Sequence, residues 1–262
     1  MARLHRSFLP PDRPWVDGRV TLDERESHHL AKVLRAKAGD EVETFDGGGE
    51  VRRCLMKKVS SHAVELESLE ISSSAPVHPS FALGVAVPKG KKMNEIVRQA
   101  GEMGAACIVP LITARSEGSS DPGRWETKRA KWANEAIEAC KQSGNPHLPE
   151  IEPFRSLGDW LTGLESETFK IVASLESDSF PLRHWLESPG SAERPQKIAL
   201  LIGPEGDLTP EEYASARSAG FLPCTFGDNV LRVDTAVLCA FAVAKEEFRA
   251  YFALQPTNPR ND

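Results

Sequence analysis

The most constraining feature of this chain is an apolar run that ends abruptly in a glycine-rich loop. Ile198–Ile202 is followed by Gly203-Pro204-Glu205-Gly206. A short apolar run bounded by glycine is typical of a buried strand, and open α/β sheets bind ligands in the loops that follow such strands. A second break of this kind comes at Phe226-Gly227, shortly before Leu231-Arg232 and a final helix expected from about Asp234 to Phe252. The two loops predict one ligand site.

Apolar runs alternate with helical patterns over the C-terminal two thirds of the chain. We expect strands at Leu83–Val87, Cys107–Leu111, Phe169–Ala173 and Ile198–Ile202. This alternation predicts a largely parallel sheet. Between the two glycine loops, capping and stop signals predict a helix, namely Thr209, Pro210, Glu212 and Gly220.

The N-terminal part has a different character. Short β segments such as Val42–Phe45 and Ala63–Leu66 surround one expected helix at roughly Glu24–Lys37, and a Ser/Pro-rich stretch at residues 71–79 favours no regular element. We therefore expect a mostly β domain at 1–72, a linker at 73–79, an α/β domain at 80–254 and a flexible tail at 255–262.

Composition excludes several classes of protein. A chain of 262 residues is long enough for about two domains with real cores. The longest apolar run, Ala236–Ala244, is far shorter than the roughly 18 to 20 residues of a membrane-spanning helix, and the first thirty residues contain no hydrophobic segment of the kind a signal peptide has. We expect a cytoplasmic protein. Its five cysteines show no Cys-x-x-Cys spacing, which predicts buried reduced thiols and no metal.

The charge is unevenly distributed. The formal net charge is −6, but residues 1–60 hold 12 lysines and arginines against 10 acidic residues, so all of the negative excess lies further on. A phosphate backbone favours basic partners, and the N-terminal part is therefore the better candidate for binding RNA. The alternative explanation is that these lysines and arginines simply belong to ordinary solvated surface.

Familiar nucleotide and catalytic motifs are missing from the sequence. The stretch from Gly84 to Lys92 lacks the spacing of a P-loop, and no Gly-x-Gly-x-x-Gly opens a helix after the first strand. Spacing alone assembles no Ser-His-Asp or Cys-His triad. The adjacent His28 and His29 do not point the same way on a helix, which argues against metal binding there.

The two glycine loops resemble the cofactor loops of SPOUT methyltransferases, and nearly the whole chain resembles the RsmE family, which methylates a uridine of small-subunit ribosomal RNA. The similarity in the N-terminal part rests on Arg6-Ser7-Phe8, on the run from His28 to Arg35 with Gly39-Asp40, and on Phe45-Asp46-Gly47. Further along it rests on Pro88-Lys89-Gly90, Glu102-Met103-Gly104, Arg115-Ser116, Gln142-Ser143 and Gly203-Pro204-Glu205-Gly206.

The resemblance implies a PUA-like β-barrel domain followed by a SPOUT α/β domain with a C-terminal trefoil knot. It also implies S-adenosylmethionine (SAM) as methyl donor, N3 of a uridine in small-subunit ribosomal RNA as methyl acceptor, and a homodimer. The cofactor residues would be Leu175, Ile202, Gly203, Pro204, Glu205, Gly206, Phe226, Gly227, Val230, Leu231, Thr235 and Ala236. The RNA-binding residues would be Arg6, His29, Arg35, Lys89 and Arg115.

Methyl transfer to uracil N3 requires loss of a proton and stabilisation of negative charge on the uracil oxygens. Arg232 is the candidate for this electrostatic role, although it could instead clamp a phosphate or pair with Asp234. Asp234 is the second catalytic candidate, because it could orient Arg232 or accept the N3 proton. Its place at the start of the final helix favours a third role, that of helix N-cap.

Several positions depart from the family pattern. Asp207-Leu208 stands where Gly-Phe is customary, Asp234 where Glu is usual, Asn229 where arginine is common, and Gln99 where lysine is common. Two other functions therefore stay open. One is a non-catalytic RNA-binding or ribosome-assembly factor, and the other is a ribose 2′-O-methyltransferase of the same superfamily. The apolar stripe at Trp132, Ala136, Ile137 and Cys140 suits either a dimer interface or, as we favour, the core.

Overall fold

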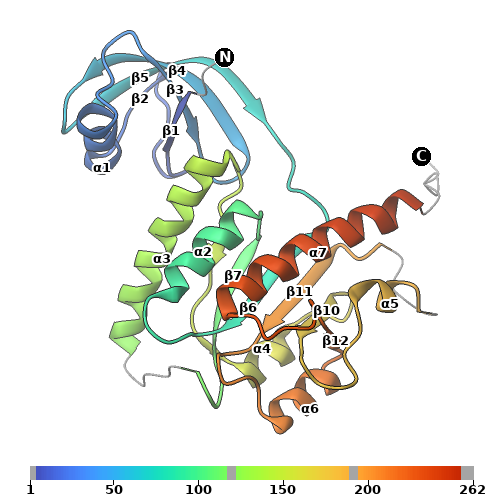
Figure 1. Ribbon diagram of the computed structural model, residues 1–262. Coiled ribbons are helices and arrows are strands. Elements are labelled where there is room, and N and C mark those ends of the chain that lie inside the picture. The colour runs from blue at the N-terminus through green and yellow to red at the C-terminus, as the bar shows by residue number, and fades with distance from the viewer. Residues whose placement is uncertain (1–3, 117–121, 189–193, 255–262) are drawn as a thin grey trace. The chain divides into compact units, whose positions relative to one another are not determined.

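The computed structural model describes residues 4–116, 122–188 and 194–254, and the chain divides into two compact units (Figure 1). The first unit runs through Pro76 and also includes Ala136–Pro149, and the second unit holds Val77–Glu135 and the chain from Glu150 onward. The division after Pro76 falls inside the expected linker. Residues 136–149, however, join the first unit, although the sequence places them within the α/β domain. The expected tail at 255–262 lies outside the described residues.

The first unit is built on a mostly antiparallel sheet with the strand order β1-β3-β4-β5-β2. Only the β1–β3 pair is parallel among its described pairs. The bounds are β1 His5–Phe8, β2 Arg19–Thr21, β3 Glu41–Phe45, β4 Glu50–Val59 and β5 Val64–Ser73. The expectation that residues 71–79 form no regular element holds for residues 74–79 but is wrong for Ile71–Ser73, because Arg52 and Val51 of β4 pair with Ile71 and Ser72 and extend β5 to Ser73.

One short helical segment closes the core of this unit. Helix α1 (Glu24–His28) is capped by Asp23, whose side chain accepts a hydrogen bond from the Glu26 amide at 2.8 Å. It continues as a π-helical turn, η1 (His29–Val33). The expected helix is therefore shorter than predicted at its C-terminal end. Arg35 adopts a φ of 56°, a left-handed conformation that ends a helix. Leu30 of η1 is fully buried in the core with Val42, Cys54 and Leu66.

The C-terminal end of α3 (Pro122–Ser143) belongs to the first unit through buried charged groups. The Lys141 ammonium lies 3.1 Å from a carboxylate oxygen of Glu26, and both side chains are almost entirely buried. Arg6 is also buried, with its Nε 3.1 Å from Glu43 and its Nη1 donating to the Cys140 carbonyl at 3.3 Å. Three residues of the apolar stripe on this helix, Trp132, Ala136 and Cys140, are buried within the chain as favoured, whereas Ile137 is only half-buried.

The second unit is an α/β domain whose described strand pairs are all parallel. The strand order is β12-β10-β11-β6-β7-β8, and β9 also pairs with β7. The bounds are β6 Ser80–Ala86, β7 Cys107–Ile112, β8 Glu150–Ile151, β9 Arg155–Ser156, β10 Phe169–Ala173, β11 Lys197–Ile202 and β12 Leu222–Cys224. Ile198 to Ile202 of β11 are all buried, which is the continuous apolar pattern expected of a central parallel strand.

Helices cover both faces of this sheet (Figure 1). Successive strand residues point to opposite faces, so Ala199 and Leu201 pack with Trp160 of α4 and Ala216 of α6. On the other face, Phe81 lies 5.8 Å from Phe241 of α7, measured between ring centroids. The helix bounds are α2 Lys92–Glu102, α4 Leu157–Gly163, α5 Leu182–Leu186, α6 Pro210–Ser218 and α7 Val233–Leu254.

The capping prediction for α6 is confirmed. Thr209 accepts a hydrogen bond from the Glu212 amide, the Glu212 side chain accepts one from the Thr209 amide, and Pro210 opens the helix. The trefoil knot stays a prediction that comes from the family resemblance.

Gly84 in the middle of β6 gives a test of this packing. A Cβ built there would lie 2.6 Å from Cζ3 of Trp160, so Gly84→Ala should displace the indole and destabilise the second unit by about 1–3 kcal/mol. The matched control is Gly158→Ala in α4, where a Cβ would meet nothing closer than 4.0 Å and helix propensity should raise stability slightly. Thermal unfolding of both variants measures this. Equal midpoints would contradict the packing described.

Candidate functional site

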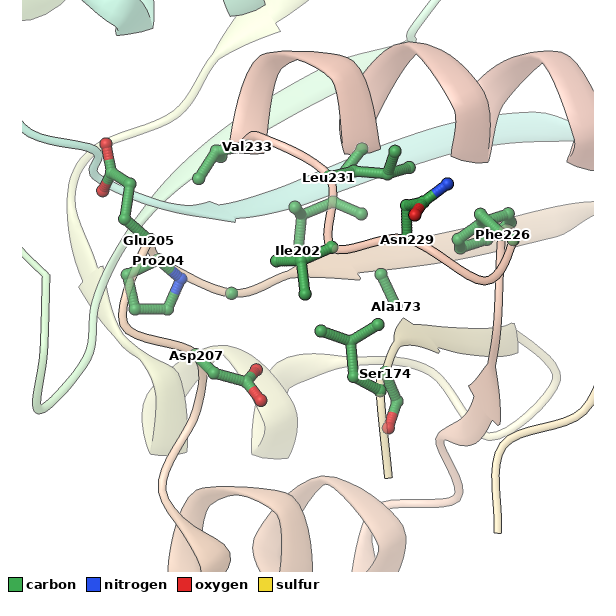
Figure 2. A pocket seen from close by; sticks show the side chains of 15 residues that line it. Ala173, Ser174, Ile202, Pro204, Glu205, Asp207, Phe226, Asn229, Leu231 and Val233 are labelled. Carbon is green, nitrogen blue, oxygen red and sulfur yellow. The ribbon is translucent and has the colours of Figure 1, made fainter. Parts of the chain in front are cut away.

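A cavity of about 630 Å³, open to solvent, lies at the carboxyl ends of three neighbouring strands of the second unit (Figure 2). The segments that follow β10, β11 and β12 form its walls together with the first turn of α7. This is the edge at which parallel α/β sheets bind ligands. The lining residues are Ala173, Ser174, Leu175, Ile202, Gly203, Pro204, Glu205, Asp207, Phe226, Gly227, Asn229, Val230, Leu231, Val233 and Ala236.

The loop after β11 is held by backbone and side-chain contacts. The Asp207 amide donates to the Pro204 carbonyl at 2.9 Å, which closes a turn over Pro204-Glu205-Gly206-Asp207. Nη1 of Arg115 donates to the Gly206 carbonyl at 2.6 Å. A Cβ at Gly206 would lie only 3.3 Å from Cδ of Arg115. Arg115 therefore supports the loop from the end of β7.

Glu205 points out of this loop toward the segment after β6. Its carboxylate accepts a hydrogen bond from Nζ of Lys92 at 3.0 Å and a long one from the Lys89 amide at 3.5 Å. Burial opposes ionisation of Glu205, but these hydrogen bonds outweigh it and hold the pKa of this carboxyl below its ordinary value. The Glu205 carboxylate thus links the loop after β11 to the segment after β6 through charged hydrogen bonds.

Asp207 follows the loop with a φ of 62°, which is unusual for a residue with a Cβ. Its Oδ1 accepts hydrogen bonds from the Leu208 amide and from the Tyr213 hydroxyl, each at 2.8 Å. Burial raises the pKa of Tyr213, and its hydrogen bond to Asp207 raises it further, so the hydroxyl stays protonated and donates.

The opposite wall comes from the loop after β12 and the start of α7. Gly227 has a φ of 133°, a conformation that residues with a Cβ rarely adopt, and its carbonyl accepts from the Thr225 hydroxyl at 3.0 Å. Leu231, Val233 and Ala236 then supply apolar lining together with Ile202. An apolar slot between two backbone loops can hold a flat heteroaromatic ring.

The two catalytic candidates stand at the first turn of α7. Arg232 is exposed and makes no salt bridge within the described part of the chain, so the ion pair with Asp234 does not form. The favoured N-cap role of Asp234 is wrong, because α7 begins at Val233 and places Asp234 inside the first turn. Its Oδ1 is buried, and no described residue donates to it. Neither side chain lines the cavity itself.

The structure brings most of the predicted cofactor residues together around this one cavity. Gly206 and Thr235 do not line it, since Gly206 turns toward Arg115 and Thr235 is exposed on α7. The lining residues that sequence reasoning did not assign to the cofactor are Ala173, Ser174, Asp207, Asn229 and Val233. The end of the predicted strand Phe169–Ala173 was the available signal for the first two.

The predicted RNA-binding residues differ in how accessible they are. Arg35, Lys89 and Arg115 are exposed. Arg6 is buried and held by Glu43 and Cys140, which disagrees with a phosphate-binding role. Burial lowers the pKa of His29, and the charge of Lys141 lowers it further, so this ring is neutral at pH 7 and a weak partner for phosphate.

The five cysteines all lie among the described residues. Burial raises the pKa of Cys54 and Cys140 to about 11, and all five cysteines are free thiols. Across residues 4–116, 122–188 and 194–254, no cluster of three His, Cys, Asp or Glu side chains could hold a metal ion. None of the described helices combines the length and apolar character needed to cross a membrane.

The mostly antiparallel β unit and the parallel α/β domain with glycine loops at its ligand edge correspond to two known family models. Residues 76–245 match the family model described as an RNA methyltransferase domain, and residues 22–67 match the RNA methyltransferase PUA domain. The first match alone covers more than half of the chain.

Individual relatives narrow the class. The chain is 30% identical to ribosomal RNA small subunit methyltransferase E of Synechocystis over 91% of its own length and 76% of the relative's. Among solved structures it is similar to ribosomal RNA small subunit methyltransferase E of Neisseria gonorrhoeae bound to SAM, with a TM-score of 0.82, 26% identity, and coverage of 93% of this chain and 98% of that one. A methyltransferase structure from Legionella pneumophila with bound SAM gives a TM-score of 0.83 at 26% identity, covering 94% and 98%. The chain belongs to the ribosomal RNA small subunit methyltransferase E family.

Proposed function

We propose that this protein is a SAM-dependent methyltransferase that methylates N3 of a uridine in small-subunit ribosomal RNA. The observation that carries the proposal is the cavity at the ends of β10, β11 and β12, in a chain whose structural relatives are solved with SAM at 26% identity. Since its substrate would be ribosomal RNA, we place its action in the cytoplasm.

The residues of the cavity suit the proposed cofactor. Ile202, Leu231 and Ala236 offer an apolar slot for adenine, and the backbone of the two glycine loops can bond its edge without side chains. Ser174 and Asp207 add polar atoms on the adjoining wall. When bound, SAM supplies an activated methyl group on a sulfonium centre.

Arg232 is the residue that we propose acts on the RNA base. It is exposed, has no described carboxylate partner, and stands between the lining residues Leu231 and Val233. From there its guanidinium can stabilise negative charge that develops on a uracil oxygen as the N3 proton leaves. Asp234 is the proposed acceptor of the N3 proton; its Oδ1 has no described donor but is buried, so RNA binding would have to uncover it.

The exposed basic residues are proposed RNA contacts. Arg35 serves in the first unit, and Lys89 and Arg115 serve near the cavity. Asn229, where the family often has arginine, lines the cavity without adding charge there, so affinity would depend more on these other sites.

We also propose a homodimer. Val230 at the cavity rim is 80% exposed, and Leu238 and Val243 of α7 are exposed apolar residues further along the same segment. Apolar surface of this kind beside a ligand site is suited to a partner subunit. Light scattering after gel filtration should give twice the mass of the 28.7 kDa chain, and a monomeric mass would overturn this assignment.

The reaction itself is tested with purified protein, SAM carrying a labelled methyl group, and small ribosomal subunits from cells that lack the gene. Nucleoside analysis of the RNA should show label in N3-methyluridine. Label in a ribose-methylated nucleoside would favour the 2′-O-methyltransferase. RNA binding with no transfer would favour the non-catalytic assembly factor.

A further inference from the structure

Asp207 occupies a backbone conformation that a residue with a Cβ adopts at a cost. Its φ of 62° lies in the left-handed region, where glycine is the residue without steric penalty. The chain nevertheless carries an aspartate here, directly after the glycine loop. Its carboxylate accepts two hydrogen bonds that a glycine at this position could not accept.

Two hydrogen bonds to one oxygen of the Asp207 carboxylate fix its orientation. Oδ1 accepts from the Leu208 amide and the Tyr213 hydroxyl, both at 2.8 Å, and these two donor residues are buried at 3% and 2% exposure. A side chain that is fixed in this way loses little entropy when it binds a ligand. Tyr213 is thus a positioning residue for Asp207.

The second oxygen, Oδ2, has no donor among the described residues. Asp207 lines the cavity, and Figure 2 shows its carboxylate on the Ser174 side, away from Glu205. Glu205 differs because Lys92 and the Lys89 amide already engage both of its oxygens. Asp207 is therefore the lining carboxylate with an oxygen left for a ligand.

We propose that Asp207 is a further cofactor-binding residue, whose Oδ2 accepts a hydrogen bond from a donor of SAM outside the adenine ring, either a ribose hydroxyl or the α-ammonium group. The inference rests on the proposed function, since it takes SAM as the occupant of the cavity. Adenine is assigned to the apolar slot formed by Ile202, Leu231 and Ala236, which leaves the hydroxyl and ammonium donors for the polar wall.

Isothermal titration of SAM and of 5′-methylthioadenosine into the whole protein tests this inference. Asp207→Asn keeps the shape but presents a donor in place of an acceptor, and Asp207→Gly removes the carboxylate while tolerating the left-handed backbone. Both variants should bind SAM about tenfold more weakly or worse. Methylthioadenosine has the ribose but no ammonium, so an equal loss for both ligands identifies a ribose hydroxyl, and a loss for SAM alone identifies the ammonium.

The matched control is Asp228→Asn, which removes an exposed charge of the loop after β12 that does not line the cavity. It should bind SAM like the wild type. Unchanged SAM affinity in both Asp207 variants, or an equal loss in Asp228→Asn, would overturn the assignment of Asp207. If the wild-type protein fails to bind SAM, the proposed function itself fails.

Discussion

Replacing Arg232 by alanine should lower the rate constant of methyl transfer by about 10²–10³-fold at saturating SAM and RNA, while SAM affinity stays within about twofold of wild type. The rate should fall because a guanidinium that stabilises charge formed only in the transition state contributes to the chemical step and little to ground-state binding. The affinity should hold because Arg232 lies outside the cavity lining. Single-turnover transfer to methyl-deficient subunits and titration of SAM measure the two quantities separately.

Two further variants sharpen this prediction. Arg232→Lys keeps the positive charge without the planar fork and should fall between wild type and alanine. Arg249→Ala removes an exposed arginine of the same helix that pairs only with Glu246 among the described residues, and it should react at the wild-type rate. Full activity of Arg232→Ala, or loss of SAM binding in parallel with activity, would show that Arg232 has another role.

Replacing Lys141 by methionine should destabilise the first unit by about 3–5 kcal/mol, because it leaves the carboxylate of Glu26 buried without its cation. The side chains of Lys141 and Glu26 are only 7% and 5% exposed, and the second oxygen of Glu26 already has no described donor. Glu138, the other partner of Lys141, is 45% exposed, so the loss of this second ion pair should contribute little. Chemical denaturation followed by circular dichroism measures the loss.

The controls separate burial from charge. Lys58→Met makes the same substitution in an exposed pair of the same unit, with Glu65 at 2.9 Å, and should leave the unfolding midpoint almost unchanged. The double variant Glu26→Leu/Lys141→Met replaces the buried pair by apolar groups and should recover most of the stability. A Lys141→Met protein as stable as wild type would contradict the burial of this ion pair.

Much of the ligand edge could be predicted from local sequence because its signals are local. Thr209, Pro210 and Glu212 specify the start of α6 through neighbouring hydrogen bonds alone. The runs Phe169–Ala173 and Ile198–Ile202 are buried parallel strands, and such strands are read directly from their apolar residues. Their neighbouring positions in one sheet then place the loops that follow them around one cavity.

Other features depend on contacts between distant segments and leave no local signal. The burial of Arg6 arises from Glu43 and Cys140, and the latter lies 134 residues away. β5 extends through Ser73 because β4 continues beside it, although its own Ser-rich end favours a linker. The orientation of the Asp207 carboxylate likewise depends on Tyr213 of α6, whose hydroxyl donates to Oδ1 and leaves Oδ2 free among the described residues. Each case is a tertiary contact overriding local preference.

The central claim is that this chain methylates N3 of a uridine in small-subunit ribosomal RNA, and nucleoside mass spectrometry of that RNA from cells with and without the gene tests it most directly. The account predicts N3-methyluridine in the first RNA, its loss in the second, and its return when the wild-type gene, but not the Arg232→Ala variant, is restored. An N3-methyluridine content that does not depend on the gene would contradict the account.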